Sequence, residues 1–121
     1  MSVLRRWAPL ALMAVLAGCG GGATKPSVAE PAGPTTLRVT IADGEVKPRG
    51  ARVDLLVGQP LTLSVRSDAA EEIHVHSDPE REFEVKPGRR QQFTLTVDRP
   101  GKVAVEVHDL DVVVAEVLVR K

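Results

Sequence analysis

The sequence predicts an all-β protein, an antiparallel β-sandwich with Greek-key connections. From Thr36 onward, apolar and polar residues alternate with a period of two, which is typical of strands that bury one face. Turn-forming segments separate these runs at intervals of roughly 8 to 12 residues, a spacing typical of sandwiches. Valine is abundant and aromatic residues make up only 2% of the chain, so the core must be aliphatic. We therefore assign residues 36–121 to one sandwich domain.

Eight strands are expected, and each follows from its apolar residues. Residues 37–41 alternate clearly, as do residues 61–67, whereas residues 112–119 are apolar at nearly every position, as expected of a central strand. Residues 44–50 contain proline and two glycines, so we expect a turn there. The expected strands are 37–41, 53–57, 61–67, 73–75, 83–85, 93–97, 103–107 and 112–119.

The first 19 residues resemble the precursor of a bacterial lipoprotein. Arg5 and Arg6 precede an apolar stretch that is too short to cross a bilayer as a helix and ends in the lipobox sequence Leu-Ala-Gly-Cys19. The resemblance implies that residues 1–18 are a signal peptide and that Cys19 becomes a lipidated N-terminus carrying diacylglycerol and palmitate. It places the domain on the extracytoplasmic side of a membrane in the cell envelope, with the membrane as partner through the lipid anchor.

Residues 19–35 are predicted to be a flexible linker, because glycine, proline, alanine and serine dominate them. Cys19 is the single cysteine of the chain, so no intramolecular disulfide can form. The formal net charge is 0, which gives no electrostatic reason to expect nucleic acid as a partner.

Four segments in order make the domain similar to a cupredoxin: VGQPLTLSV at 57–65, IHVHS at 73–77, VKPG at 85–88 and PGKVAVEVH at 100–108. More narrowly, it resembles the cupredoxin-like domains of exported lipoproteins and iron-uptake proteins. A blue-copper site needs two histidines, a cysteine thiolate and commonly a methionine. The only cysteine is Cys19 and the methionines are Met1 and Met13, all before the domain. The sequence therefore excludes a blue-copper electron-transfer site.

A different metal site is predicted from the histidines. His74 and His76 share one face of their strand, and Glu106 and His108 share a face of another. In cupredoxins these two strands are antiparallel neighbours, and a register pairing His74 with His108 would pair His76 with Glu106. Three imidazoles and a carboxylate suit copper or zinc. The other interpretation is that these histidines are exposed side chains of a strand that binds no metal.

Several further acidic residues lie close to the histidines in the sequence. Asp78 and Asp109 are expected near the histidines, either as an additional ligand or as partners that orient the ligands. A second group is predicted to be solvated positions on outer faces and turns rather than an acid–base pair: Glu71, Glu72, Glu80, Glu82 and Glu84.

The serines lack the context of a hydrolase nucleophile. We therefore expect a non-enzymatic, membrane-anchored binding module. The alternative is a metal-free structural or protein-interaction domain with an envelope protein as partner.

Overall fold

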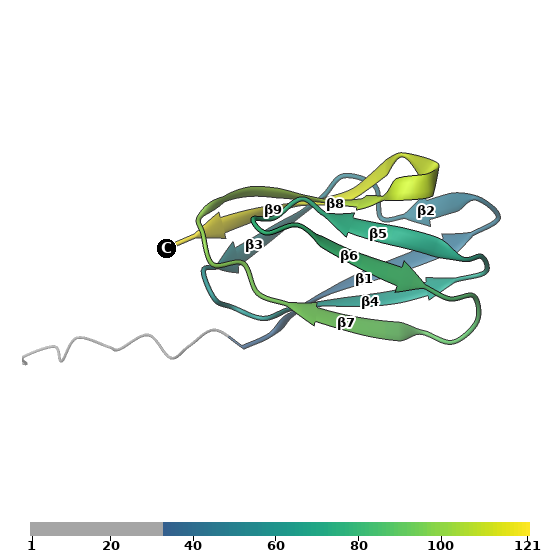
Figure 1. Ribbon diagram of the computed structural model, residues 1–121, viewed down its shortest axis with the longest axis horizontal. Helices are drawn as coiled ribbons and strands as arrows, with labels where there is room; N and C mark the ends of the chain where they lie inside the picture. The colour runs from purple at the N-terminus through teal and green to yellow at the C-terminus, as the bar shows by residue number, and fades with distance from the viewer. Residues whose placement is uncertain (1–32) are drawn as a thin grey trace, which may run out of the picture.

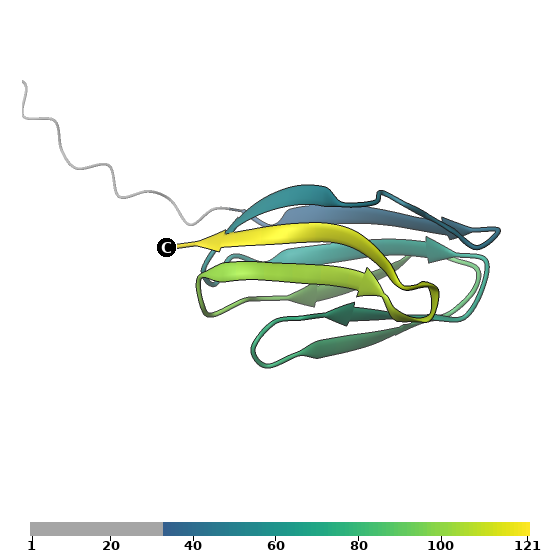
Figure 2. The ribbon, with the colours of Figure 1, turned by 90° about the horizontal axis from the view of Figure 1, so that it is seen from above.

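The computed structural model describes residues 33–121, which form a domain of strands and one short 3₁₀ turn, η1 (Figure 1). The strands run along the length of the molecule, and η1 lies at the end opposite the C-terminus in both views (Figure 2). The elements are β1 (Thr35–Ala42), β2 (Glu45–Lys47), β3 (Ala51–Leu56), β4 (Leu61–Ser67), β5 (Glu71–Val75), β6 (Arg81–Val85), β7 (Gln91–Leu95), β8 (Gly101–Val107), η1 (His108–Leu110) and β9 (Val112–Arg120).

Two sheets make up the sandwich, which confirms the predicted fold class. One has the strand order β2-β1-β4-β7 and the other the order β3-β9-β8-β5-β6. Both sheets are mixed, because β1 pairs with β4 in parallel and β3 pairs with β9 in parallel. The prediction of a purely antiparallel sandwich was therefore wrong for these two pairs. The alternation of apolar and polar residues within a strand predicts which residues face inward, but it does not predict whether the neighbouring strand is parallel or antiparallel.

The core lies between the sheets and is aliphatic, as the composition predicts. Inward positions recur at every second residue, so that β1 alternates strictly between buried and exposed side chains from Leu37 to Ala42. Phe83 of β6 and Phe93 of β7 stack with ring centroids 5.0 Å apart and join the two sheets where β6 and β7 form their edges. The largest fully buried side chains are Ile41, Leu55, Leu61, Leu63, Ile73, Val39, Val46, Val65, Val75, Val85, Val105 and Val107.

The segment expected to be only a turn, residues 44–50, contains strand β2. Val46 in the middle of β2 is 2% exposed and lies opposite Ile41 of β1. Asp43 and Gly44 make the tight turn between the two strands, both with positive φ, which glycine adopts without strain. Strand β2 thus has a single buried side chain, Val46, and one apolar residue is too few to produce an alternation pattern in the sequence.

Gln59 connects the start of β1 to the loop between β3 and β4. Its Oε1 accepts a hydrogen bond of 2.8 Å from the Leu56 amide, and its Nε2 donates to Gly33 O at 2.7 Å and to Thr35 Oγ1 at 2.9 Å. The Thr35 amide also donates to Pro60 O at 2.9 Å. These bonds place the first residue of β1 firmly in the sheet.

The predictions for residues 1–32 lie outside the described residues. They comprise the signal peptide at 1–18, the lipidated Cys19 and most of the linker at 19–35. Within residues 33–121, the structure contains no helix of the length and apolar character needed to span a bilayer.

Candidate metal centre

The centre of the site is His74, on the outer face of the five-stranded sheet. Strand β5 lies between β6 and β8, and its inward residues Ile73 and Val75 are fully buried. His74 therefore points outward, directly opposite Glu82 on one neighbouring strand and Glu106 on the other. Its side chain is only 14% exposed because these neighbours flank it. The sheet thus presents an imidazole between two carboxylates.

His76 lies just beyond the last residue of β5 but keeps its place beside β8. Its backbone amide donates to Ala104 O at 2.9 Å. The chain then turns: the Ser77 amide donates to Val75 O, and Ser77 Oγ donates to Pro79 O. This turn brings Glu80 back alongside both histidines.

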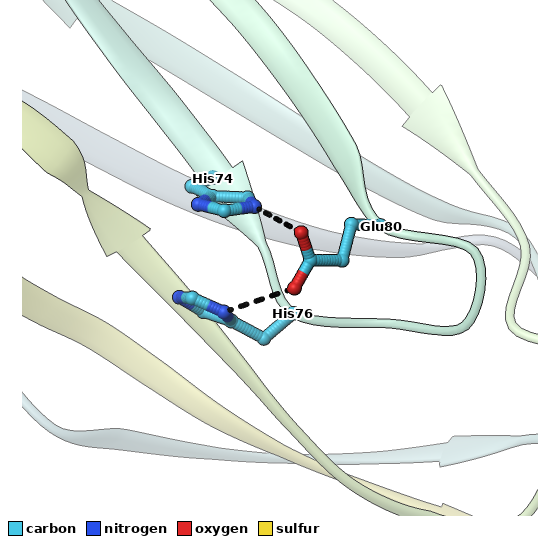
Figure 3. Close-up of side chains that lie close together, drawn as sticks. All are labelled: His74, His76 and Glu80. Carbon is cyan, nitrogen blue, oxygen red and sulfur yellow. Dashed lines mark hydrogen bonds and ion pairs between the residues drawn. The ribbon is translucent and has the colours of Figure 1, made fainter.

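Glu80 bridges the two imidazoles with its two carboxylate oxygens (Figure 3). Oε2 lies 3.1 Å from His74 Nε2, and Oε1 lies 3.7 Å from His76 Nδ1. The two rings lie side by side with centroids 4.2 Å apart and are tilted by 33° to one another. One ligand atom from each of the three residues lies within 4.8 Å of the others. This spacing is compact enough for the three atoms to share one ion.

Glu106 holds the opposite side of the His76 ring. Its Oε2 lies 3.0 Å from His76 Nε2. The hydrogen bond from His76 is the main cause that lowers the pKa of the Glu106 carboxyl below its ordinary value of 4.5; burial opposes this shift, and the nearby His76 and His108 support it. Glu106 is thus an ionised partner that fixes the orientation of the imidazole.

His108 stands farther away. It begins η1, and its ring meets the His74 ring edge-on with centroids 6.1 Å apart. The predicted pairing of His74 with His108 was wrong by two residues, because His74 lies opposite Glu106. The observed register places Ile73 opposite Val107 and Val75 opposite Val105, whereas the predicted one would have set Ile73 against Asp109. Burial of Val105 and Val107 opposite β5 decides the register. Because the difference is two residues, it leaves all four predicted ligands on one face of the sheet: His74, His76, Glu106 and His108.

Sequence reasoning missed Glu80, which it assigned to a solvated turn. The side chain is indeed 61% exposed, but it contacts both histidines. The signal was the Ser77-Asp78-Pro79 turn between two short strands, since a tight turn returns the next residue to the preceding strand.

Neither of the two aspartates expected near the histidines belongs to the group of residues whose ligand atoms converge. Asp78 forms an ion pair with Arg99 in the loop between β7 and β8. Asp109 is close enough to Glu71 to raise the pKa of that carboxyl.

Glu71 is a second acidic residue that was expected to be solvated but is partly buried in the structure. It shares the inward parity of Ile73 at the start of β5, and its Oε2 is buried without a hydrogen-bond partner. Burial raises the pKa of the Glu71 carboxyl above its ordinary value of 4.5, and the charges of Asp109 and Asp68 raise it further. This group is a source of instability in the ionised state and is separate from the histidine cluster.

The donor set of the cluster fits a divalent transition metal. Imidazole nitrogen and carboxylate oxygen suit Cu(II) and Zn(II), whereas a blue-copper centre requires a thiolate. Residues 33–121 contain neither cysteine nor methionine, so the described domain has only nitrogen and oxygen ligands to offer.

The fold belongs to the cupredoxin-like class, as comparison with solved structures shows. The particular neighbours include a reduced amicyanin variant, which is 17% identical with a TM-score of 0.51 over 78% of this chain and 87% of that one. A multicopper oxidase from Pseudomonas thermotolerans is 15% identical with a TM-score of 0.52 over 72% of this chain, and Fet3p, a multicopper oxidase that functions in iron import, is 9% identical with a TM-score of 0.55 over 73%.

This chain spans 29% of the Pseudomonas oxidase and 23% of Fet3p, so it corresponds to a part of each. At these identities the likeness establishes the fold. The sequence matches no family model and no curated protein.

Proposed function

We propose that this protein is a non-enzymatic, cupredoxin-like module that binds one divalent transition metal ion, Cu(II) or Zn(II), at His74, His76 and Glu80. The observation that carries the proposal is the convergence of one ligand atom from each residue within 4.8 Å. Two imidazoles and a carboxylate are a sufficient protein ligand set for either ion, with remaining positions open to water.

Glu106 and His108 have supporting roles in this proposal. Glu106 already contacts His76 Nε2 at 3.0 Å, so it orients that ring while Nδ1 faces Glu80. His108 is the nearest further imidazole, with its ring centroid 6.1 Å from that of His74, and we assign it as a supplementary ligand. A site of this kind, open to solvent on an outer sheet face, suits buffering or transfer of an ion rather than catalysis.

We further propose that the module is held at the extracytoplasmic surface of a membrane through lipidated Cys19. The support is the lipobox at residues 16–19, preceded by the basic and apolar regions of a signal peptide. A lipid anchor would keep the metal site close to the membrane and to envelope proteins that deliver or receive the ion.

The metal proposal is tested with residues 19–121 carrying Cys19→Ser, so that no thiol competes for the ion. Calorimetric titration with Cu(II) and with Zn(II) should show one site. His74→Ala, His76→Ala and Glu80→Gln should each weaken it, while Glu84→Gln, which replaces an exposed carboxylate on β6, serves as the matched control. Unchanged affinity in a His74→Ala/His76→Ala double variant would refute the site and favour a metal-free interaction domain.

The anchor is tested separately in a bacterial host with the complete chain. Fractionation should find the parent protein in membranes, labelled by an alkyne analogue of palmitate. Cys19→Ser should lose the label and, because a single cysteine carries the lipid, no other residue could restore it. Recovery of labelled Cys19→Ser protein would contradict the proposal.

A further inference from the structure

We infer that the histidine cluster takes copper in the oxidised state, Cu(II), and releases it when the ion is reduced to Cu(I). This inference rests on the proposed metal site and adds to it the chemical form of the ion and the event that unloads it. Three properties of the cluster support it: the kinds of donor atom, the arrangement of the rings and the surrounding charge.

The donors are the wrong kind for Cu(I). Soft thiolate and thioether ligands select Cu(I), whereas imidazole and carboxylate suit the divalent ions. No cysteine or methionine occurs after Cys19 in the sequence, so no sulfur ligand is built into the domain. After reduction, the cluster could therefore hold Cu(I) only through its imidazole nitrogens.

The arrangement of the rings does not favour that alternative. Two imidazoles hold Cu(I) best from opposite sides of the ion, in a line. The rings of His74 and His76 instead lie side by side, with centroids 4.2 Å apart and a tilt of 33°, and both contact the carboxylate of Glu80. Neighbouring ligands of this kind match adjacent corners of the tetragonal geometry that Cu(II) prefers.

The charge around the site acts in the same direction. Three carboxylates face the imidazoles: Glu80 contacts both rings, Glu82 lies 4.0 Å from His74 Nε2, and Glu106 lies 3.0 Å from His76 Nε2. Coulomb attraction to this group is greater for an ion of charge +2 than for one of charge +1. Reduction by one electron thus removes part of the attraction that holds the ion.

The site is also accessible to a reductant and to an acceptor of the ion. The side chains of His76 and Glu80 are 38% and 61% exposed. In the step we propose, a one-electron donor of the ascorbate class gives one electron to Cu(II), becoming its oxidised radical. The bonds from the imidazole nitrogens and the carboxylate to copper then break, and Cu(I) leaves without any change in the covalent structure of the protein.

The experiment uses residues 19–121 with Cys19→Ser, loaded with Cu(II) and freed of excess ion. Ascorbate is added without oxygen, and gel filtration then separates protein from small molecules before copper is measured in both. Copper should move to the small-molecule fraction. The same treatment of Zn(II)-loaded protein, which ascorbate does not reduce, should leave the metal with the protein.

A matched variant tests the reason for release. Glu80→Met supplies a thioether and removes one carboxylate, so it should retain Cu(I) that the parent loses. Copper that stays with the reduced parent protein would overturn the inference while leaving the metal site intact. Failure of the parent to load Cu(II) while it still loads Zn(II) would overturn the inference alone, and failure to load either ion would overturn the proposed site and the inference together.

Discussion

His76 forms a hydrogen bond with Glu106, which is its diagonal neighbour on β8 rather than the residue directly opposite. The ladder sets Glu106 opposite His74, yet Glu106 Oε2 lies 3.0 Å from Nε2 of His76. Diagonal neighbours on one sheet face are within reach of long side chains. The consequence is that Glu106 controls the orientation of His76, while Glu80 contacts the other nitrogen of the same ring.

Replacement of Glu106 should weaken metal binding without removing a primary ligand. We expect Glu106→Gln to lower Cu(II) affinity about 10- to 100-fold, the usual effect of losing the carboxylate that orients a histidine ligand. Competition titration against a chelator of known affinity measures this change. Glu116→Gln, an exposed carboxylate on β9, is the control and should have no effect. Equal affinities in parent and Glu106→Gln protein would show that His76 needs no such partner.

Glu71 should make the stability of the domain depend on pH. Because its folded-state pKa lies above the ordinary value of 4.5, this carboxyl favours folding below 4.5, and that contribution is lost as the pH rises through the raised pKa. Glu71→Gln stays neutral at every pH, so it should raise the free energy of unfolding at neutral pH. Urea unfolding should show this gain shrinking in acid, whereas Glu84→Gln should give no such pattern. A gain that is equal at both pH values would exclude ionisation as the cause.

The stacked phenylalanines should couple the two edge strands energetically. We expect Phe83→Ala and Phe93→Ala each to cost about 3 kcal/mol, the lower end of the range for phenylalanine, because both side chains are only partly buried. A double-mutant cycle by urea denaturation should give a coupling of about 0.5–1.5 kcal/mol for the aromatic pair. Strict additivity would mean that the contact at 5.0 Å contributes nothing beyond burial.

Gln59 should stabilise the beginning of β1. Gln59→Ala removes three hydrogen bonds, to Leu56, Gly33 and Thr35, and should lower the free energy of unfolding by about 1–3 kcal/mol. Hydrogen exchange should become faster at the Leu56 amide, which loses its acceptor. Gln92→Ala, at an exposed position of β7, is the control for loss of the side chain alone. Unchanged exchange at Leu56 would contradict this role.

The sequence was sufficient to predict the sandwich and the inward residues of its strands. Period-two alternation places Leu37, Val39 and Ile41 inside, and the structure buries all three. The same parity correctly set His74 and His76 on the outer face. These predictions succeed because they depend only on the geometry of a single strand.

Relations between strands were harder to predict. The parallel pairing of β1 with β4 depends on the path of the whole chain. The register between β5 and β8 was missed because a shift of two residues keeps every side chain on the same face, so the alternation pattern fits both registers. Glu80 was missed for a related reason. The turn after Val75 brings Glu80 close to the histidines. Turn residues have no alternating pattern, so periodicity could not predict this contact.

The inward face of β5 contributes Ile73 and Val75 to the core, whereas His74 of β5 and His76 just beyond it point to the opposite face. Substitutions at His74, His76 and Glu106 therefore leave the buried Ile73, Val75, Val105 and Val107 untouched. Descendants of this chain could gain, lose or exchange a metal without rebuilding the interior, and a designer could do the same. In this sandwich, the residues of the proposed metal site can therefore vary independently of the buried residues that stabilise the fold.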